Sequence, residues 1–375
     1  MTIDPVDGGG TAERTFQMSR FLAKAGIQCT LLTTDRGLSE NRIKALQGVK
    51  VIALPCIYDR FYIPMFSFKE IKNIVENADI IHLMSHWTII NAIIYIFARC
   101  LNKPYVICPA GELVAYGKPK FSKRLFSKVI GNKIIKNASG YIAVTANEIP
   151  QFEAYSINSD NVTIIPNGIN PEDFIISNNE GFRCKHRLGN HPYILFVGRL
   201  SSIKGPDLLL KAYHKAKDEL DRFHLVFVGP DQGMQSELEE VVRANNLTER
   251  VHFIGYLGGA DKAEAYHEAE LLVISSRHEA MSIVALEAGI TGTPVLLTDQ
   301  CGFDEIVDIN GGMVVPASVS GLYEGLVVIL KDRRNLNNMG INLQKYVRDN
   351  YTWNSVVKKF IYLYDKIINQ KIQKQ

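Results

Sequence analysis

The sequence predicts an α/β protein made of two doubly wound domains that face a cleft. Three observations favour this fold. Short apolar runs alternate with segments of helical periodicity in the first half of the chain, a polar stretch follows the turn signal Pro166-Asn167-Gly168, and the same alternation starts again after Asn190. We expect one domain over residues 1–170, a second over 171–350 and a helix over 351–375.

The first half has the alternation of a parallel sheet covered by helices. Strands are expected at 27–33, 49–54, 79–83, 104–108, 140–145 and 162–165, and helices at 12–25, 68–77, 87–101, 121–137 and 147–155. Such a domain opens with a buried strand, yet only Met1-Thr2-Ile3 precede the loop that contains Gly8-Gly9-Gly10. We therefore expect Met1 to lie inside the first strand, through a mis-assigned start or a truncation.

The second half repeats this pattern. Strands are expected at 193–197, 224–228, 251–254, 271–274, 295–297 and 313–315. A helix is expected over 282–290, with Ser282 as its N-cap residue.

The composition is that of a globular protein, with 46% hydrophobic and 22% charged residues in 375. No secretory signal opens the chain, and the longest apolar stretch, 89–98, is interrupted by Asn91 and too short to span a bilayer. The six cysteines are scattered without a C-x-x-C pair, which disfavours disulfides and metal sites. We expect a cytoplasmic protein.

The positive charge is concentrated in one segment. Residues 1–170 hold 19 Lys and Arg against 13 Asp and Glu, and seven of these basic residues lie within 118–136, which has no acidic residue. This segment predicts a basic amphipathic helix that suits the anionic inner face of the cytoplasmic membrane or a phosphate-bearing acceptor. A core helix with a basic polar face fits equally well. No nucleic-acid-binding module accompanies the charge, so we expect no nucleic-acid partner.

Two glutamates eight residues apart, Glu279 and Glu287, carry most of the functional information. Glu279 follows a buried strand in a loop, Glu287 lies in the expected helix, and a second buried strand follows, so the pair belongs to a βαβ unit. Open α/β sheets bind ligands at the carboxyl ends of their strands. Eight helical residues rise about 12 Å, so one carboxylate could hold each end of a nucleotide-sugar.

Two basic residues follow another strand of the same domain. The run Phe196-Val197-Gly198 ends this strand, Arg199 comes directly after it, and Lys204 lies close to the expected start of the next helix. An Arg can bind a diphosphate bidentately and a Lys adds a point charge. Two ordinary surface cations are the alternative, which the position at a strand end disfavours.

The run from Arg277 to Gly289 resembles the E-x7-E signature of the retaining family-4 glycosyltransferases, and Arg199 with Lys204 resembles the basic pair of the same family. The resemblance covers nearly the whole chain but is sharp only in the second domain. It implies the GT-B arrangement, with the nucleotide-sugar donor mainly on the second domain and the acceptor mainly on the first. It also implies that the C-terminal helix crosses back onto the first domain.

The resemblance implies a role for each motif residue. Glu279 would contact the donor sugar, Glu287 would bind the ribose hydroxyls, and Arg199 with Lys204 would hold the diphosphate. No metal is then expected, and the sequence has no D-x-D carboxylate cluster.

One part of the motif departs from the family. Family sequences often have Gly-Phe-Gly after the first glutamate, whereas this chain has Ala280-Met281-Ser282. The N–H groups of Met281, Ser282 and Ile283 could still face the phosphates, because the start of a helix favours anions.

The first domain offers weaker signals. Gly9 and Gly10 lie where a phosphate-binding loop is expected. His86 follows a strand, where the family often has an active-site histidine beside the transferred sugar, whereas a structural role is favoured for His82. Glu112 follows the next strand, and its contact with an acceptor stays open.

The predicted activity is retaining transfer of a sugar from a nucleoside diphosphate donor to an acceptor hydroxyl, in surface polysaccharide, lipopolysaccharide or glycolipid biosynthesis. One alternative is a nucleotide-sugar epimerase of the same architecture, which would isomerise the donor without an acceptor. The other is an inactive sugar-nucleotide-binding protein, which would bind the donor without transfer.

Overall fold

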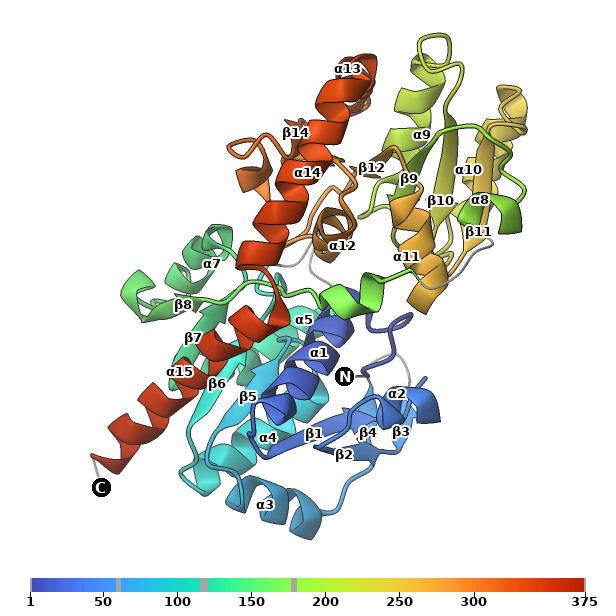
Figure 1. Cartoon of the computed structure of the whole chain (residues 1–375). Helices are drawn as coiled ribbons and strands as arrows, with labels where there is room; N and C mark the ends of the chain where they lie inside the picture. Colours follow the sequence, from blue (N-terminus) through green and yellow to red (C-terminus); the bar gives the residue numbers. More distant parts are fainter. Residues whose placement is uncertain (1, 59–61, 115–120, 177–180, 374–375) are drawn as a thin grey trace. The chain divides into compact units, whose positions relative to one another are not determined.

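The computed structural model describes residues 2–58, 62–114, 121–176 and 181–373. The chain forms two compact units (Figure 1). Unit 1 comprises Met1–Gly168 together with Trp353–Gln375, and unit 2 comprises Ile169–Thr352. The sequence predicts these boundaries at residues 170 and 350.

Unit 1 is built around parallel strands. Four strands pair in the order β5-β6-β7-β8, β1 and β2 form a separate parallel pair, and β3 pairs with β4 in antiparallel fashion. The strands are β1 (Cys29–Thr34), β2 (Val49–Leu54), β3 (Cys56–Tyr58), β4 (Ile63–Pro64), β5 (Ile81–Met84), β6 (Tyr105–Cys108), β7 (Gly140–Ala143) and β8 (Val162–Ile164). The helices are α1 (Gly9–Lys24), α2 (Glu40–Lys44), α3 (Phe68–Glu76), α4 (Ile89–Cys100), α5 (Phe121–Phe126), α6 (Asn132–Lys136), α7 (Ile149–Glu153) and α15 (Trp353–Ile372).

The residues before α1 do not form the strand that the sequence predicts. Thr2 and Ile3 are irregular, and α1 begins at Gly9. The Thr2 hydroxyl donates a 2.6 Å hydrogen bond to the carbonyl of Arg36. Ile3 is buried in a small cluster with Phe16. Side-chain contacts, and not the hydrogen bonds of a β-sheet, therefore hold these residues within unit 1.

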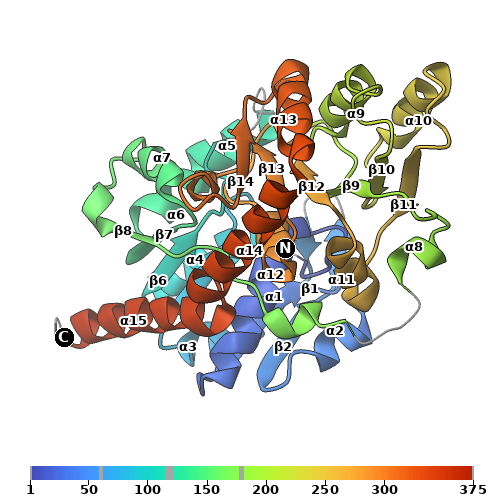
Figure 2. The same ribbon diagram turned by 45° about the horizontal axis from the view of Figure 1, so that its top comes forward.

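The C-terminal helix α15 packs on α1 within unit 1 (Figure 1 and Figure 2). Its buried residues recur at the spacing of one helical face: Trp353, Val356, Val357, Phe360, Leu363, Tyr364 and Ile367. The Trp353 ring stacks on that of Phe21 with centroids 6.2 Å apart. The Tyr364 hydroxyl lies 2.6 Å from Nδ1 of His82, so His82 anchors α15 to β5.

Unit 2 contains one parallel six-stranded sheet in the order β11-β10-β9-β12-β13-β14. The chain winds outward from β9 through β10 to β11 and then returns, so that β12 pairs with the other side of β9. The β9–β12 junction is therefore the topological switch point, where open α/β sheets bind ligands.

The elements of unit 2 match the predicted alternation. Its strands are β9 (Tyr193–Val197), β10 (His224–Val228), β11 (Val251–Gly255), β12 (Leu271–Ile274), β13 (Val295–Thr298) and β14 (Gly312–Val315). Its helices are α8 (Phe182–Lys185), α9 (Pro206–Lys215), α10 (Gln235–Ala244), α11 (Gly259–His267), α12 (Ile283–Thr291), α13 (Val319–Lys331) and α14 (Arg333–Asn350).

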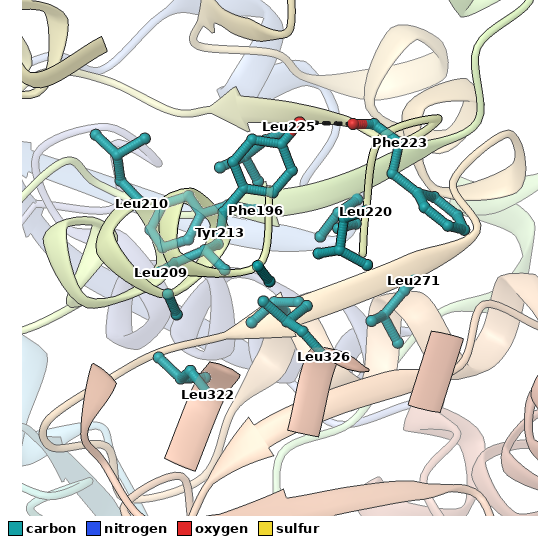
Figure 3. Packing of buried hydrophobic residues seen from close by; sticks show 14 of the residues in the cluster. Phe196, Leu209, Leu210, Tyr213, Leu220, Phe223, Leu225, Leu271, Leu322 and Leu326 are labelled. Carbon is teal, nitrogen blue, oxygen red and sulfur yellow. Dashed lines mark hydrogen bonds between the residues drawn. The ribbon is translucent and has the colours of Figure 1, made fainter. Parts of the chain in front are cut away.

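The hydrophobic core of unit 2 lies between this sheet and the helices that cover it (Figure 3). Leu225 of β10 and Leu271 of β12 are fully buried together with Leu209 of α9. Tyr213 also enters the core, and its hydroxyl donates to the carbonyl of Phe223 at 2.6 Å, so its polar atom is satisfied. This packing holds the strand ends from which the motif residues project.

The basic segment of unit 1 is helical in three joined parts, α5, a π-helical turn at Ser127–Gly131, and α6. Lys118 and Lys120 lie outside the described residues. One side of the helix is buried through Ile134 and Ile135. The apolar residues Phe121, Leu125 and Val129 are instead exposed by 80%, 51% and 59%. No described helix of the chain is long and apolar enough to cross a membrane.

Candidate active site

The two motifs of unit 2 meet at the switch point of its sheet. Arg199 and Lys204 follow β9, and Glu279 follows the neighbouring strand β12. The ammonium nitrogen of Lys204 lies 2.7 Å from Oε1 of Glu279. A cation and a carboxylate that the sequence places after separate strands thus form a direct ion pair.

The Glu279 carboxylate is oriented by the loops around it. The Ser276 hydroxyl donates a hydrogen bond to Oε1, and the Glu279 N–H donates to the carbonyl of Gln300 at 2.8 Å. The side chain is 9% exposed, against 25% for that of Lys204. The carboxylate is therefore held in place before any ligand binds.

Arg277, for which the sequence predicts no individual role, fixes the loop that carries Lys204. Its guanidinium donates to both carboxylate oxygens of Asp207, at 2.8 and 2.7 Å, and to the carbonyl of Ser202 at 2.6 Å. Burial works to raise the pKa of Asp207, but the hydrogen bonds and charge of Arg277 outweigh it and hold that pKa below its usual value. The sequence indicates that these two residues could meet. Arg277 closely follows β12, Asp207 lies in the first turn of the helix after β9, and the two strands flank the switch point.

Gly205 brings the same loop against the end of β12. Its φ is +66°, and a Cβ atom there would lie 2.1 Å from the carbonyl oxygen of Ser275, so only glycine fits this position. The Ser275 hydroxyl donates to the carbonyl of Gly205 at 2.8 Å. The part of the loop that leads into α9 is thereby fixed against the end of β12.

Arg199 differs from the other charged residues of the site. Its side chain is half-buried, and no hydrogen bond or ion pair of its guanidinium is recorded among the residues that the structure describes. The five N–H donors of this group are available to a bound anion.

Glu287 lies on α12 with its side chain 7% exposed. The Lys262 ammonium lies 2.7 Å from Oε1, and the Tyr266 hydroxyl donates to Oε2 at 2.6 Å. Burial, followed by the charge of Glu287, raises the pKa of Tyr266 well above its usual value, so the phenol stays a donor. Both partners come from one face of α11 at i and i+4 spacing, and this spacing is the sequence signal that could have found them.

The start of α12 differs in detail from the expectation. Ser282 occupies the N-cap position as predicted, but its hydroxyl makes no capping hydrogen bond, and its buried Oγ has no partner within the described part of the chain. Its N–H donates to the carbonyl of Cys301 at 3.1 Å. Of the three N–H groups expected to face phosphates, that of Ser282 is therefore already used within the protein, while those of Met281 and Ile283 stay predictions.

The interval between the two glutamates is only partly helical. α12 begins at Ile283, so Glu279 lies in the loop before it and Glu287 in its second turn. The helical rise of about 12 Å over eight residues therefore does not describe the separation of Glu279 and Glu287.

In unit 1, Gly9 and Gly10 form the first turn of the 16-residue helix α1 rather than a separate loop. Gly9 has a φ of +56°, a conformation that favours glycine. The first N–H groups of a helix have no intrahelical partners, so this turn retains the chemistry of an anion site.

His86 lies just past β5, as predicted, but its imidazole is fully buried. The ring lies 4.6 Å from that of Trp87 and 5.9 Å from that of Phe126, between centroids. Burial and then the charge of Lys123 lower its pKa to about 4. Neither ring nitrogen has a hydrogen-bond partner among the residues described. The imidazole is therefore neutral and shielded by the basic helix, and its contact with a sugar stays a prediction.

Glu112 supports the loop that carries His86. Its carboxylate accepts hydrogen bonds from the Ser85 hydroxyl and, at 3.0 Å, from the N–H of His86. Ser85 has a φ of +71°, an unusual value for a residue with a side chain. Glu112 thus holds this turn in its conformation. Nowhere in the described part of the chain do three or more His, Cys, Asp or Glu side chains gather so as to hold a metal ion.

Two protein-family models match the chain, one on each half. The model described as Glycosyltransferase Family 4 matches residues 8–173, and the model described as Glycosyl transferases group 1 matches residues 178–346.

Curated relatives are also glycosyltransferases. An uncharacterized glycosyltransferase of Methanocaldococcus jannaschii is 32% identical over 56% of this chain and 55% of that protein. The D-inositol 3-phosphate glycosyltransferase of Nocardia farcinica is 29% identical over 57% of this chain and 50% of that protein, so the chain spans about half the length of both. The enzyme of the same name from Corynebacterium diphtheriae is 23% identical over 96% of this chain and 90% of that protein.

Solved structures share the fold at low sequence identity. HepE of Anabaena, crystallised with UDP and glucose, has a TM-score of 0.80 and 16% identity over 96% of both chains. Sucrose-phosphate synthase of Thermosynechococcus elongatus has a TM-score of 0.75 and 21% identity over 96% of this chain and 94% of that one. This fold is GT-B. With the two family models on its two halves, the chain belongs to the glycosyltransferases of family 4 and group 1.

Proposed function

We propose that the protein is a retaining glycosyltransferase that moves a sugar from a nucleoside diphosphate donor to an acceptor hydroxyl, in surface polysaccharide, lipopolysaccharide or glycolipid biosynthesis. The observation that carries the proposal is the ion pair of Lys204 and Glu279 at the switch point. Arg199 lies on the same loop as Lys204. HepE, which shares the fold, has been crystallised with UDP-glucose.

The charged residues of unit 2 can handle a diphosphate. Arg199 would bind its oxygens bidentately, and the Lys204 ammonium would turn from Glu279 to the phosphate. When the bond between the anomeric carbon and the diphosphate oxygen breaks, negative charge grows on the leaving group. These two cations stabilise that charge, which makes the proposed reaction independent of a metal.

The two carboxylates would hold the neutral ends of the donor. Glu279 would accept hydrogen bonds from hydroxyls of the transferred sugar, and Glu287 from those of the ribose. In the proposed same-face substitution, the acceptor oxygen bonds to the anomeric carbon on the side that the diphosphate leaves. The acceptor proton passes to the departing diphosphate oxygen. The sequence further predicts donor contacts for Gly9, Gly10 and His86 of unit 1.

The first test is a thermal-shift screen of nucleotides and nucleotide-sugars with the full chain. A ligand that binds only the folded state raises the apparent stability, so stabilisation by a nucleoside diphosphate identifies the donor base. Transfer is then measured with that donor and candidate acceptors. Glu279→Ala and Lys204→Ala should nearly abolish transfer while the protein stays folded, and full activity of either variant would overturn the assignment.

The same assay separates the alternatives. An isomerised donor in the absence of any acceptor would indicate an epimerase, and binding without transfer to any acceptor would indicate an inactive binding protein. The match to glycosyltransferase models and relatives favours the transferase over both.

The exposed side of the basic helix supports a peripheral contact with an anionic membrane. Phe121, Leu125 and Val129 recur every four residues and face solvent. Exposed basic residues accompany them along the described part of the helix: Arg124, Lys128, Lys133 and Lys136. Apolar side chains that insert between lipids and cations that meet their phosphates are the two features of an interfacial helix.

Vesicle co-sedimentation tests this contact. The protein should bind vesicles that contain phosphatidylglycerol and not vesicles of phosphatidylcholine alone, and Phe121→Ser with Leu125→Ser should release it. Ile341→Ser is the matched control, because Ile341 is 65% exposed on unit 2. Equal binding to both vesicle types, or equal release by the control, would contradict the proposal.

A further inference from the structure

Unit 2 has a pocket at the amino ends of its strands, whereas the candidate active site lies at their carboxyl ends. Asn190 precedes β9, Arg222 and Phe223 precede β10, and Glu270 precedes β12, so the pocket lies at the amino ends of these strands. It is partly open to solvent and has a volume of about 130 Å³. β9 has five residues, so at about 3.3 Å per residue this edge is roughly 16 Å from Arg199.

The pocket collects positive charge from separate parts of unit 2. Arg183 comes from α8, Arg222 from the turn before β10, and Arg333 from the start of α14. Glu270 is the one acidic residue among those that line it. Three guanidinium groups around one small volume repel one another unless an anion or carboxylate lies between them.

The carboxylates nearby neutralise only part of this charge. The Arg333 Nη2 atom lies 2.6 Å from Oε1 of Glu270. Arg183 donates to the carbonyl of Glu268 at 2.7 Å, with its Nε 3.6 Å from the Glu268 carboxylate. For Arg222 no ion pair is recorded among the residues that the structure describes; its guanidinium instead lies over the Phe223 ring, 4.8 Å from the centroid.

We propose that this pocket is a second anion site, which binds a small molecule that carries a phosphate group. Arginine is the residue best suited to phosphate, because its planar fork matches two phosphate oxygens. The volume exceeds that of a phosphate ion, and the Phe223 side chain with the Asn190 amide offers an apolar and a polar contact to the remainder of a phosphomonoester. The proposal does not depend on the proposed donor site, which lies at the carboxyl ends of the strands.

Calorimetric titration of the full chain with inorganic phosphate and with ribose 5-phosphate tests the site. Arg222→Gln should weaken binding about tenfold, the loss expected for one charge-assisted hydrogen bond. Arg222 is the variant of choice because it makes no recorded ion pair, so the fold should tolerate its loss. Arg243→Gln, at an exposed position on α10, is the matched control and should bind as the wild type does.

The donor site must be excluded as the source of the signal. The Arg199→Ala/Lys204→Ala double variant should keep its affinity for both probes, and loss of binding there would overturn the proposal. So would equal binding by Arg222→Gln and wild type, or a response that sodium chloride of the same ionic strength reproduces. Tighter binding of ribose 5-phosphate assigns the site to a phosphomonoester, and equal affinities assign it to inorganic phosphate.

Discussion

Lys204 and Glu279 form a 2.7 Å ion pair across the ends of two adjacent parallel strands, β9 and β12. In the protein without ligand, each of these two charges neutralises the other. A diphosphate that binds Lys204 must therefore compete with Glu279. In the unliganded protein, the ion pair and the Ser276 hydroxyl hold the Glu279 carboxylate in one orientation.

The ion pair predicts that substitutions of Lys204 and Glu279 change the activity and the stability of the protein in different ways. Lys204→Met lowers kcat/KM by about 100-fold or more, because a cation at the leaving group is lost. It also lowers the unfolding midpoint, because Glu279 is left nearly buried without its partner. Adding Glu279→Gln to this variant should restore the midpoint but not the activity. A double variant that stays as unstable as Lys204→Met would contradict this account.

Lys185 and Glu264 provide the matched control for this experiment. The Lys185 ammonium lies 2.9 Å from the Glu264 carboxylate, with side chains 23% and 2% exposed, and also 2.8 Å from the exposed Asp261. Lys185→Met should lower the unfolding midpoint and leave kcat/KM unchanged, since this pair is formed by α8 and α11 and not by the switch-point loops.

The hydrogen bond from Tyr266 to Glu287 predicts a second effect. Tyr266→Phe leaves one oxygen of a nearly buried carboxylate without its donor, which costs about 2 kcal/mol of stability. It should also weaken UDP binding several-fold in calorimetric titration, because Glu287 is no longer held in one orientation. Tyr213→Phe is the control: it removes an equally buried hydrogen bond, of 2.6 Å, and should leave UDP affinity unchanged. Equal affinities of the two variants would argue against a nucleotide contact of Glu287.

The strands of unit 2 could be predicted from the sequence, whereas the contacts between the candidate site residues could not. β9, β10 and β12 are buried on both faces, so each is a continuous apolar run whose bounds can be found from the sequence alone. The position of Glu279 after β12 follows from this. Its pairing with Lys204 depends in addition on strand order, which a single sequence does not reveal.

Burial of the functional side chains was the least predictable property. His86 is shielded by Phe126, which belongs to a helix far along the chain, and no local pattern near His86 indicates it. Likewise, Ser282 occupies the N-cap position that its residue type predicts, but its N–H donates to the carbonyl of Cys301 in the loop after β13, a contact that no local pattern indicates. Local rules predict the element, and packing from distant segments determines the polar contacts.

The unpartnered hydroxyl of Ser282 predicts a variant that gains stability and loses affinity. A buried donor without a partner costs free energy, so Ser282→Ala should leave stability unchanged or raise it. If this hydroxyl meets a donor phosphate, the same change weakens UDP binding about two- to tenfold, the worth of one hydrogen bond. Ser19→Ala is the control, since that buried hydroxyl donates to the carbonyl of Thr15 at 2.9 Å. The control should lose about 1 kcal/mol of stability and bind UDP normally. Lower stability of Ser282→Ala without a change in affinity would contradict the assignment.

Buried histidines predict that the protein loses stability in mild acid. Burial lowers the pKa of His82 to about 3, and burial with the charge of Lys123 lowers that of His86 to about 4. In the unfolded chain these imidazoles take up protons near pH 6.5, so between that pH and the folded-state pKa the unfolded state binds more protons and is favoured as the pH falls. Above that range neither state is charged at these sites, and they add no pH dependence. Each group contributes a slope of at most about 1.4 kcal/mol per pH unit. Urea unfolding at pH 7, 6, 5 and 4 should therefore show a steeper loss of stability for the wild type than for His86→Leu, and parallel profiles would show that His86 is not a buried neutral imidazole.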